Sequence, residues 1–235
     1  MNFILFLKEL TPPFLWKIFK KLKKKQKYFG LYNLDIKLEK YLNYNNGYFI
    51  ELGANNGVEQ SNTFYFEKEK NWTGILIEPI LHKYLDCKKN RSKNNKFFCA
   101  ACVSFDFKEN FVKLLYSNLM TIPTNLESDI TEKFEHANYS NTIRKNKEEV
   151  VEFYSKAKTL NSLLIEAKSP NLIDLLSIDV EGSEVEILKG IDFNEFKFKY
   201  ILIETRNIEK ISQFLNKQEY KLIEKLSYHD YLFGP

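Results

Sequence analysis

The sequence has few cysteines and no long apolar run. Its three cysteines, Cys87, Cys99 and Cys102, are an odd number, so at least one thiol has no disulfide partner within the chain. Cys99 and Cys102 have the CxxC spacing of half a zinc site, but no second pair or nearby histidine completes it, and we interpret them as packing residues. This cysteine usage fits a reducing, cytoplasmic compartment. No apolar run approaches the roughly 20 residues that a membrane span needs.

The greater part of the chain also lacks an excess of positive charge. The formal net charge is +4, but the first 27 residues contain one acidic residue, Glu9, and many lysines: Lys8, Lys17, Lys20, Lys21, Lys23, Lys24, Lys25 and Lys27. The remainder is therefore slightly acidic. Because affinity for phosphate needs clustered basic side chains, we expect no nucleic-acid partner.

Residues 1–27 form a lysine-rich, amphipathic segment that is interrupted at Pro12 and Pro13. The order of its charged and apolar parts is the reverse of a secretory signal. Two interpretations stay open. The segment lies on an anionic membrane surface, which would place the protein at the inner face of the membrane, or it packs on the body with its lysines in solvent.

Residues 28–235 alternate short β-rich runs with helical patterns, which predicts one α/β domain. The Ser227–His229 connection is short enough to make the last two strands antiparallel. We therefore expect a seven-stranded, doubly wound sheet with an antiparallel last strand and helices on both faces. The predicted strands are Tyr48–Leu52, Gly74–Glu78, Lys96–Val103, Ile173–Asp179, Tyr200–Thr205, Lys221–Leu226 and Asp230–Phe233. The predicted helices are Asn62–Glu69, Ile80–Asn90, Glu184–Lys189 and Ile208–Asn216.

The regular alternation breaks between about residues 104 and 158. This stretch is too long for a plain crossover, so we expect a hairpin and a lid over the substrate. A charged run near Ile143–Ser155 predicts a helix within it.

The motif FIELGANNG, from Phe49 to Gly57, is an apolar strand that ends in Glu51 and runs into a loop with Gly53 and Gly57. Ligands of doubly wound sheets bind at the carboxyl ends of the strands, where glycine lets the backbone approach closely. The spacing is not GxGxxG, which disfavours a dehydrogenase that binds pyrophosphate. In the next strand, GILIEP places Glu78 where a carboxylate can accept hydrogen bonds from a ribose diol.

Acidic residues end two more of the predicted strands. LLSIDVEGSE delivers Asp179 and Glu181 to the same edge, and ILIETR delivers Glu204, followed by Arg206. Any one of these carboxylates can instead cap the next helix or pair with Arg206. Four acidic strand ends in one sheet favour a functional edge.

These motifs resemble the FkbM family of methyltransferases in three places: GYFIELGANNGVEQSNT at 47–63, GILIEP at 74–79, and TLNSLLIEAKSPNLIDLLSIDVEGSEVEILKG at 159–190. The resemblance implies a class I methyltransferase fold, S-adenosylmethionine as methyl donor, and O-methylation of sugars or natural products. It also implies that Asp179, Glu181 and Gly182 lie beside the transferred methyl group. The loop of Glu51, Gly53, Asn55 and Gly57 is then expected to hold the methionine part of the donor, and Glu78 its ribose.

A hydroxyl acceptor must lose its proton, either to a general base or through a divalent cation that lowers its pKa. The base candidates are Asp179, Glu181 and His229, and the candidate Mg²⁺ site consists of Asp179, Glu181 and Glu204. His136 and Tyr139 of the expected lid, with Arg206, are candidate substrate contacts. The predicted function is O-methylation of a sugar or glycan hydroxyl. The alternatives are a non-sugar small molecule as acceptor, or an inactive donor-binding or membrane-surface scaffold. The sequence leaves the oligomeric state open.

Overall fold

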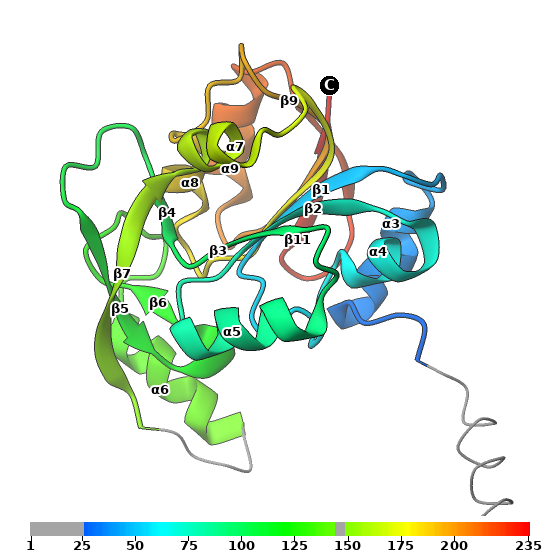
Figure 1. Cartoon of the computed structure of the whole chain (residues 1–235). Coiled ribbons are helices and arrows are strands. Elements are labelled where there is room, and N and C mark those ends of the chain that lie inside the picture. The colour runs from blue at the N-terminus through cyan, green and yellow to red at the C-terminus, as the bar shows by residue number, and fades with distance from the viewer. Residues whose placement is uncertain (1–25, 144–148) are drawn as a thin grey trace, which may run out of the picture.

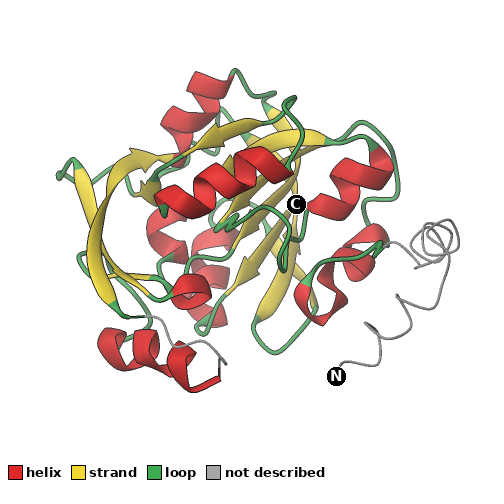
Figure 2. Cartoon of the chain, turned by 60° about the horizontal axis from the view of Figure 1, so that its bottom comes forward, coloured by secondary structure: helices red, strands yellow, loops and turns green. Residues whose placement is uncertain are grey.

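The protein is built around a seven-stranded sheet with helices on both faces (Figures 1 and 2). The structure is a computed structural model that describes residues 26–143 and 149–235. The strands are β1 (Tyr48–Leu52), β2 (Thr73–Ile77), β3 (Lys96–Phe98), β8 (Leu172–Ile178), β9 (Lys197–Glu204), β10 (Lys221–Lys225) and β11 (Asp230–Gly234). Their order is β10-β11-β9-β8-β1-β2-β3, and β11 runs antiparallel to both of its neighbours. This confirms the predicted fold class.

The side-chain alternation of β1 explains why both faces of the sheet are covered. Ile50 and Leu52 belong to one core cluster, and Phe49 belongs to another on the opposite face, because successive residues of a strand point to opposite sides. The Phe49 face packs on α3 (Leu34–Glu39), which follows the short helix η1 (Leu31–Asn33), and on α4 (Phe64–Lys70) and α5 (Leu81–Asn90). The Ile50 face packs on α7 (Leu160–Ala167), α8 (Glu184–Leu188) and α9 (Ile208–Asn216).

A second, four-stranded sheet lies beside the main one, at the left of Figure 1. Its strands are β4 (Ala101–Val103), β5 (Phe111–Tyr116), β6 (Ile122–Pro123) and β7 (Val151–Thr159), in the order β4-β7-β5-β6. The stretch between β5 and β7 also contains the short helix η2 (Asn118–Met120) and helix α6 (Lys133–Ile143). The assignment of residues 104–158 as a lid, and of residue 28 as a domain boundary, stays a prediction.

Two predicted elements of this region are wrong. The single strand expected over Lys96–Val103 is divided, because β3 pairs with β2 in the main sheet and β4 pairs with β7 in the second sheet. The helix expected near Ile143–Ser155 gives way to β7 from Val151 onward, since this segment pairs along its length with β5. Tertiary pairing overrides the local helical pattern here.

Residues 1–25 lie outside the described part of the chain, so the predicted amphipathic segment at 1–27 stays a prediction. Within the described ranges, no helix is both long enough and apolar enough to cross a membrane.

Candidate functional site

A cavity of about 360 Å³ lies at the carboxyl ends of the central strands. The register places Leu52 opposite Ile77 on one side and Ile178 on the other, so the residues that follow β1, β2 and β8 meet at one edge. The cavity falls within the range of about 300–1,000 Å³ typical of small-molecule sites. Its wall includes most of the residues expected at the site, namely Gly53, Asn55, Glu78, Asp179, Glu181, Tyr139, Glu204 and Arg206.

The loop after β1 approaches the cavity closely because it begins with glycine. Gly53 has φ +76°, and a Cβ there would lie 2.0 Å from the Asp179 carbonyl oxygen. Asn55, at φ +46°, donates its backbone N–H to Glu78 Oε2 over 2.7 Å. The buried Asn55 Oδ1 has no hydrogen-bond partner among the described residues. A bound ligand with a donor group would satisfy this oxygen.

Glu78 joins the loops that follow β1 and β2. Its carboxylate accepts from Asn55 N and, over 2.8 Å, from Ile80 N. Burial raises the pKa of Glu78 to about 7, although these two hydrogen bonds favour the charged form. The ionised carboxylate is therefore held in place but poorly solvated, which favours a ligand that donates hydrogen bonds to it.

Asp179 and Glu204 are neighbouring carboxylates on the wall. The Asp179 side chain is accessible to solvent and lines the cavity. Burial raises the pKa of Asp179 well above its usual range, and the charges of Glu204 and Glu181 raise it further. Burial likewise raises the pKa of Glu204 to about 7, with the charges of Glu181 and Asp230 adding to it and Arg206 opposing it. Like charges this close favour the retention of a proton by the pair.

Glu181 connects this edge of the sheet with α6. Its backbone has φ +55°, and its Oε2 lies 2.9 Å from Nε2 of the buried His136. Tyr139 follows on the same helix and reaches the cavity wall. A second, more open hollow of about 430 Å³ lies beside the cavity and is lined by His136, Tyr139 and Arg206, among others. The structure thus brings the three expected substrate contacts together.

Three of the expected site residues lie elsewhere. His229 is exposed in the turn between β10 and β11, outside the residues that line the cavity. Glu51 and Gly57 are also missing from the wall. Glu51 lies on the same face of β1 as Phe49, because alternate residues of a strand point to the same side. Its carboxylate therefore points away from the cavity, toward the start of α4. There it accepts from Ser61 Oγ, Asn62 N and Thr63 Oγ1.

Two residues that sequence reasoning missed belong to this region. Ser183 is buried on the cavity wall, and its Oγ has no partner in the described ranges. Arg91 is fully buried and hydrogen-bonded to Glu51. One signal could have indicated Arg91, because arginine occurs three times among 35 basic residues. A chain that otherwise uses lysine uses arginine where a planar fork is needed.

The described residues contain no group of three or more His, Cys, Asp or Glu side chains arranged to hold a metal ion. Asp179, Glu181 and Glu204 therefore do not fit the expected Mg²⁺ site.

Comparison with known proteins adds evidence from outside the chain. A family model described as the methyltransferase FkbM domain matches residues 51–231. No curated protein matches. Among solved structures, a precorrin-6y C5,15-methyltransferase from Geobacter metallireducens is 13% identical, with 91% of this chain and 90% of that chain covered and a TM-score of 0.43. A methyltransferase FkbM from Methylobacillus flagellatus is 11% identical, with 89% of this chain and 56% of that chain covered and a TM-score of 0.44.

A SAM-dependent methyltransferase from Leishmania major is 9% identical, with 86% of this chain and 71% of that chain covered and a TM-score of 0.42. The family model is the specific finding, since its match begins at Glu51 and ends in β11, so that it includes the whole carboxyl edge described above. The chain belongs to the methyltransferase FkbM family.

Proposed function

We propose that the protein transfers a methyl group from S-adenosylmethionine to a hydroxyl oxygen of a sugar or glycan-type acceptor. The observation that carries this proposal is the convergence of three expected donor residues, Gly53, Asn55 and Glu78, with Asp179 on one cavity.

The residues present fit the donor. Gly53 leaves room beside the backbone of Asp179, and the unpartnered Asn55 Oδ1 can accept from the ammonium of a methionine moiety. Glu78 has the position and the charge to accept hydrogen bonds from a ribose diol. When bound, S-adenosylmethionine supplies a methyl group on a positively charged sulfur, which is already activated for transfer.

The protein must align the acceptor and accept its proton. Asp179 is open to the cavity, and once its pair with Glu204 has lost the shared proton, the raised pKa makes the Asp179 carboxylate a stronger base than an ordinary aspartate. As the acceptor oxygen takes the methyl group, its proton passes to the Asp179 carboxylate. Glu181 holds His136 beside this point and orients the acceptor through that ring.

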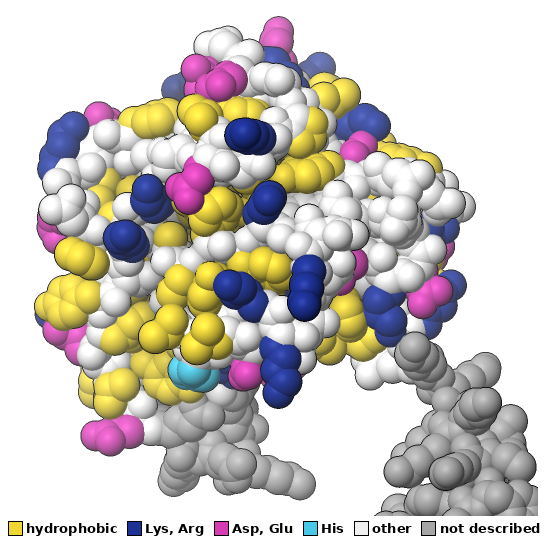
Figure 3. Space-filling view, viewed as in Figure 1, with side chains coloured by type: hydrophobic (Ala, Val, Ile, Leu, Met, Phe, Trp, Pro, Cys, Tyr) yellow, Lys and Arg dark blue, Asp and Glu magenta, His cyan; other side chains and the backbone are white. Residues whose placement is uncertain are grey.

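The open hollow next to the cavity supports a sugar-like acceptor. Tyr139 offers an aromatic face to a ring, while His136 and Arg206 offer polar contacts to hydroxyl groups. On the face of the molecule in Figure 3, basic side chains are spread out, with acidic and apolar side chains between them. On this face, the distribution differs from the clustered basic surface that binds nucleic acid. A location in the cytoplasm, at a membrane surface, is part of the same proposal.

Thermal unfolding with and without ligand tests the donor site, because no acceptor needs to be known. S-adenosylmethionine and S-adenosylhomocysteine at about 100 times their dissociation constants should stabilise the protein by roughly 2.7 kcal/mol, a shift of about 5 to 10 °C. NAD and Mg²⁺, added separately, serve as negative controls and should leave the unfolding midpoint unchanged. Absence of a shift with both methionine-derived ligands would favour the scaffold alternative.

If the donor binds, the acceptor class is tested with isotopically labelled S-adenosylmethionine and a panel of sugars, nucleotide sugars and non-sugar alcohols. We expect label in the sugar products. Label confined to the non-sugar alcohols would overturn the acceptor class and leave the donor site standing.

A further inference from the structure

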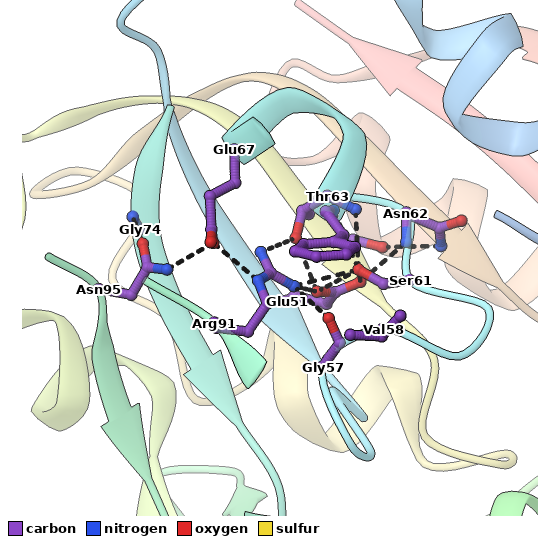
Figure 4. A network of polar contacts seen from close by, with 12 residues as sticks. Glu51, Gly57, Val58, Ser61, Asn62, Thr63, Glu67, Gly74, Arg91 and Asn95 are labelled. Atoms are coloured by element: carbon purple, nitrogen blue, oxygen red, sulfur yellow. Dashed lines mark hydrogen bonds and ion pairs between the residues drawn. The ribbon is translucent and has the colours of Figure 1, made fainter. Parts of the chain in front are cut away.

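Arg91 is the centre of a buried polar network behind the loop that follows β1 (Figure 4). Its side chain is fully buried, and those of Glu51 and Glu67 are 5% and 9% exposed. The guanidinium donates from Nη1 to Glu51 Oε2 over 3.1 Å and from Nε to Glu67 Oε2 over 2.7 Å. A buried arginine bonded to two carboxylates costs desolvation energy that offsets much of its attraction to them, so the network contributes a fixed geometry more than net stability.

The same guanidinium also holds the loop. Nη1 donates to the Gly57 carbonyl over 3.0 Å and to Ser61 Oγ over 3.2 Å, and Nη2 donates to Thr63 Oγ1 over 2.9 Å. Gly57 packs directly against the arginine, because a Cβ at this position would lie 2.7 Å from Arg91 Cγ. Gly57 N in turn donates to the Ala54 carbonyl over 2.8 Å. Arg91 thereby fixes the far end of the turn that carries Gly53 and Asn55 to the cavity.

Arg91 also relates this loop to Glu78. It follows directly after α5, the helix that begins three residues beyond Glu78. Glu78 holds the loop at Asn55 N, and Arg91 holds it at the Gly57 carbonyl. The two ends of one helix therefore fix two points of one loop, which sets the distance between the Asn55 and Glu78 side chains.

We propose that Arg91 and Glu51 are positioning residues for the donor, which act by holding the Gly53–Gly57 loop and do not touch the donor themselves. This inference rests on the proposed function. It assigns to Glu51 an indirect role in place of the direct contact that the sequence suggested.

The test is the affinity of the full-length protein for S-adenosylhomocysteine, measured by calorimetry, beside the midpoint of thermal unfolding. Arg91→Lys keeps the charge but cannot reach all of the partners of the guanidinium fork. Ser61→Ala removes the hydroxyl that joins Glu51, Arg91 and the start of α4. It leaves no buried charge unpaired, so it keeps the test decisive if Arg91→Lys does not fold. We expect each variant to bind the ligand about tenfold or more weakly, as when a supporting shell is loosened.

Asp174→Asn is the matched control. Asp174 accepts from Tyr48 N over 2.7 Å and from Tyr44 Oη over 2.6 Å, and it pairs with Lys199, in a partly buried network near the opposite end of β1. The Asp174→Asn variant should have a lower unfolding midpoint than the wild type and an unchanged affinity for S-adenosylhomocysteine. Unchanged affinity in both loop variants, or an equal loss in Asp174→Asn, would overturn the inference. Failure of the wild-type protein to bind would instead refute the donor site, and this inference with it.

Discussion

Glu78 combines a raised pKa with a place on the cavity wall, so donor affinity should depend on pH through this residue. A ribose diol donates to the ionised carboxylate, and the affinity scales with the ionised fraction. With a pKa of about 7, that fraction is about one in eleven at pH 6 and about ten in eleven at pH 8. Binding should therefore be about tenfold weaker at pH 6, which corresponds to about 1.4 kcal/mol.

Glu78→Gln removes this titration. The variant should bind S-adenosylhomocysteine more weakly than the wild type at pH 8, and its affinity should change far less between pH 6 and pH 8. Calorimetry at both pH values measures this. Because the same ligand is used for both proteins, titration of the ligand itself cancels in the comparison. A wild-type affinity that does not vary with pH, or a variant that keeps the full tenfold change, would refute the reasoning.

The stability of the free protein should change in the opposite sense. Burial raises the pKa of Glu78 in the folded state from 4.5 to about 7, so the folded state holds the proton more tightly than the unfolded state. This tighter proton binding contributes up to about 3 kcal/mol to the free energy of unfolding. The contribution is fully present below about pH 4.5 and is lost as the pH rises through 7. Glu78→Gln removes this titration, so the unfolding midpoint of its free form should fall less between pH 5 and pH 8 than that of the wild type.

Three further predictions concern other parts of the chain. Asp179→Asn should abolish methyl transfer while leaving donor affinity nearly unchanged, and undiminished turnover in a defined assay would contradict the role of the base. Gly53→Ala should cost at least about 1–3 kcal/mol in thermal unfolding, because the residue needs a positive φ and a Cβ would collide with the Asp179 carbonyl oxygen, and it should abolish donor binding. Deletion of residues 1–27 should reduce flotation with anionic vesicles, because each lysine lost near the surface weakens the free energy of membrane binding by about 1 kcal/mol at low salt. Equal flotation of both proteins would contradict the membrane interpretation.

Local sequence patterns predicted the elements that the main sheet buries on both faces. The bounds of β1 and α9 are those expected, because apolar side chains there follow strand and helix periods without interruption. The sequence failed where the chain changes sheets. Nothing in the apolar run from Lys96 to Val103 shows that it leaves one sheet for another, since both parts are apolar strands.

The site was predictable as far as the strand ends, because parallel strands must deliver Glu78, Asp179 and Glu204 to a common edge. The sequence did not show on which side of the sheet each of these side chains lies. Glu51 lies one residue before the end of β1, so its alternation sends it under α4, and its partner Arg91 carries no motif. His229 was expected at the ligand edge because the turn before the last strand is short, but its side chain is exposed outside the cavity.

The position of β11 has a consequence for how the molecule assembles during synthesis. β10 lies at the edge of the main sheet and pairs there with β11, which follows it in the chain. While a ribosome still holds β11, β10 has no place to dock, and the β9 edge is bare. β11 pairs Asp230 with Glu204, so the carboxylate edge takes its final form only at this last step. In a nascent chain that has already paired β1, β2 and β8, the part of the cavity at Glu78 should therefore form before the part at Asp179 and Glu204.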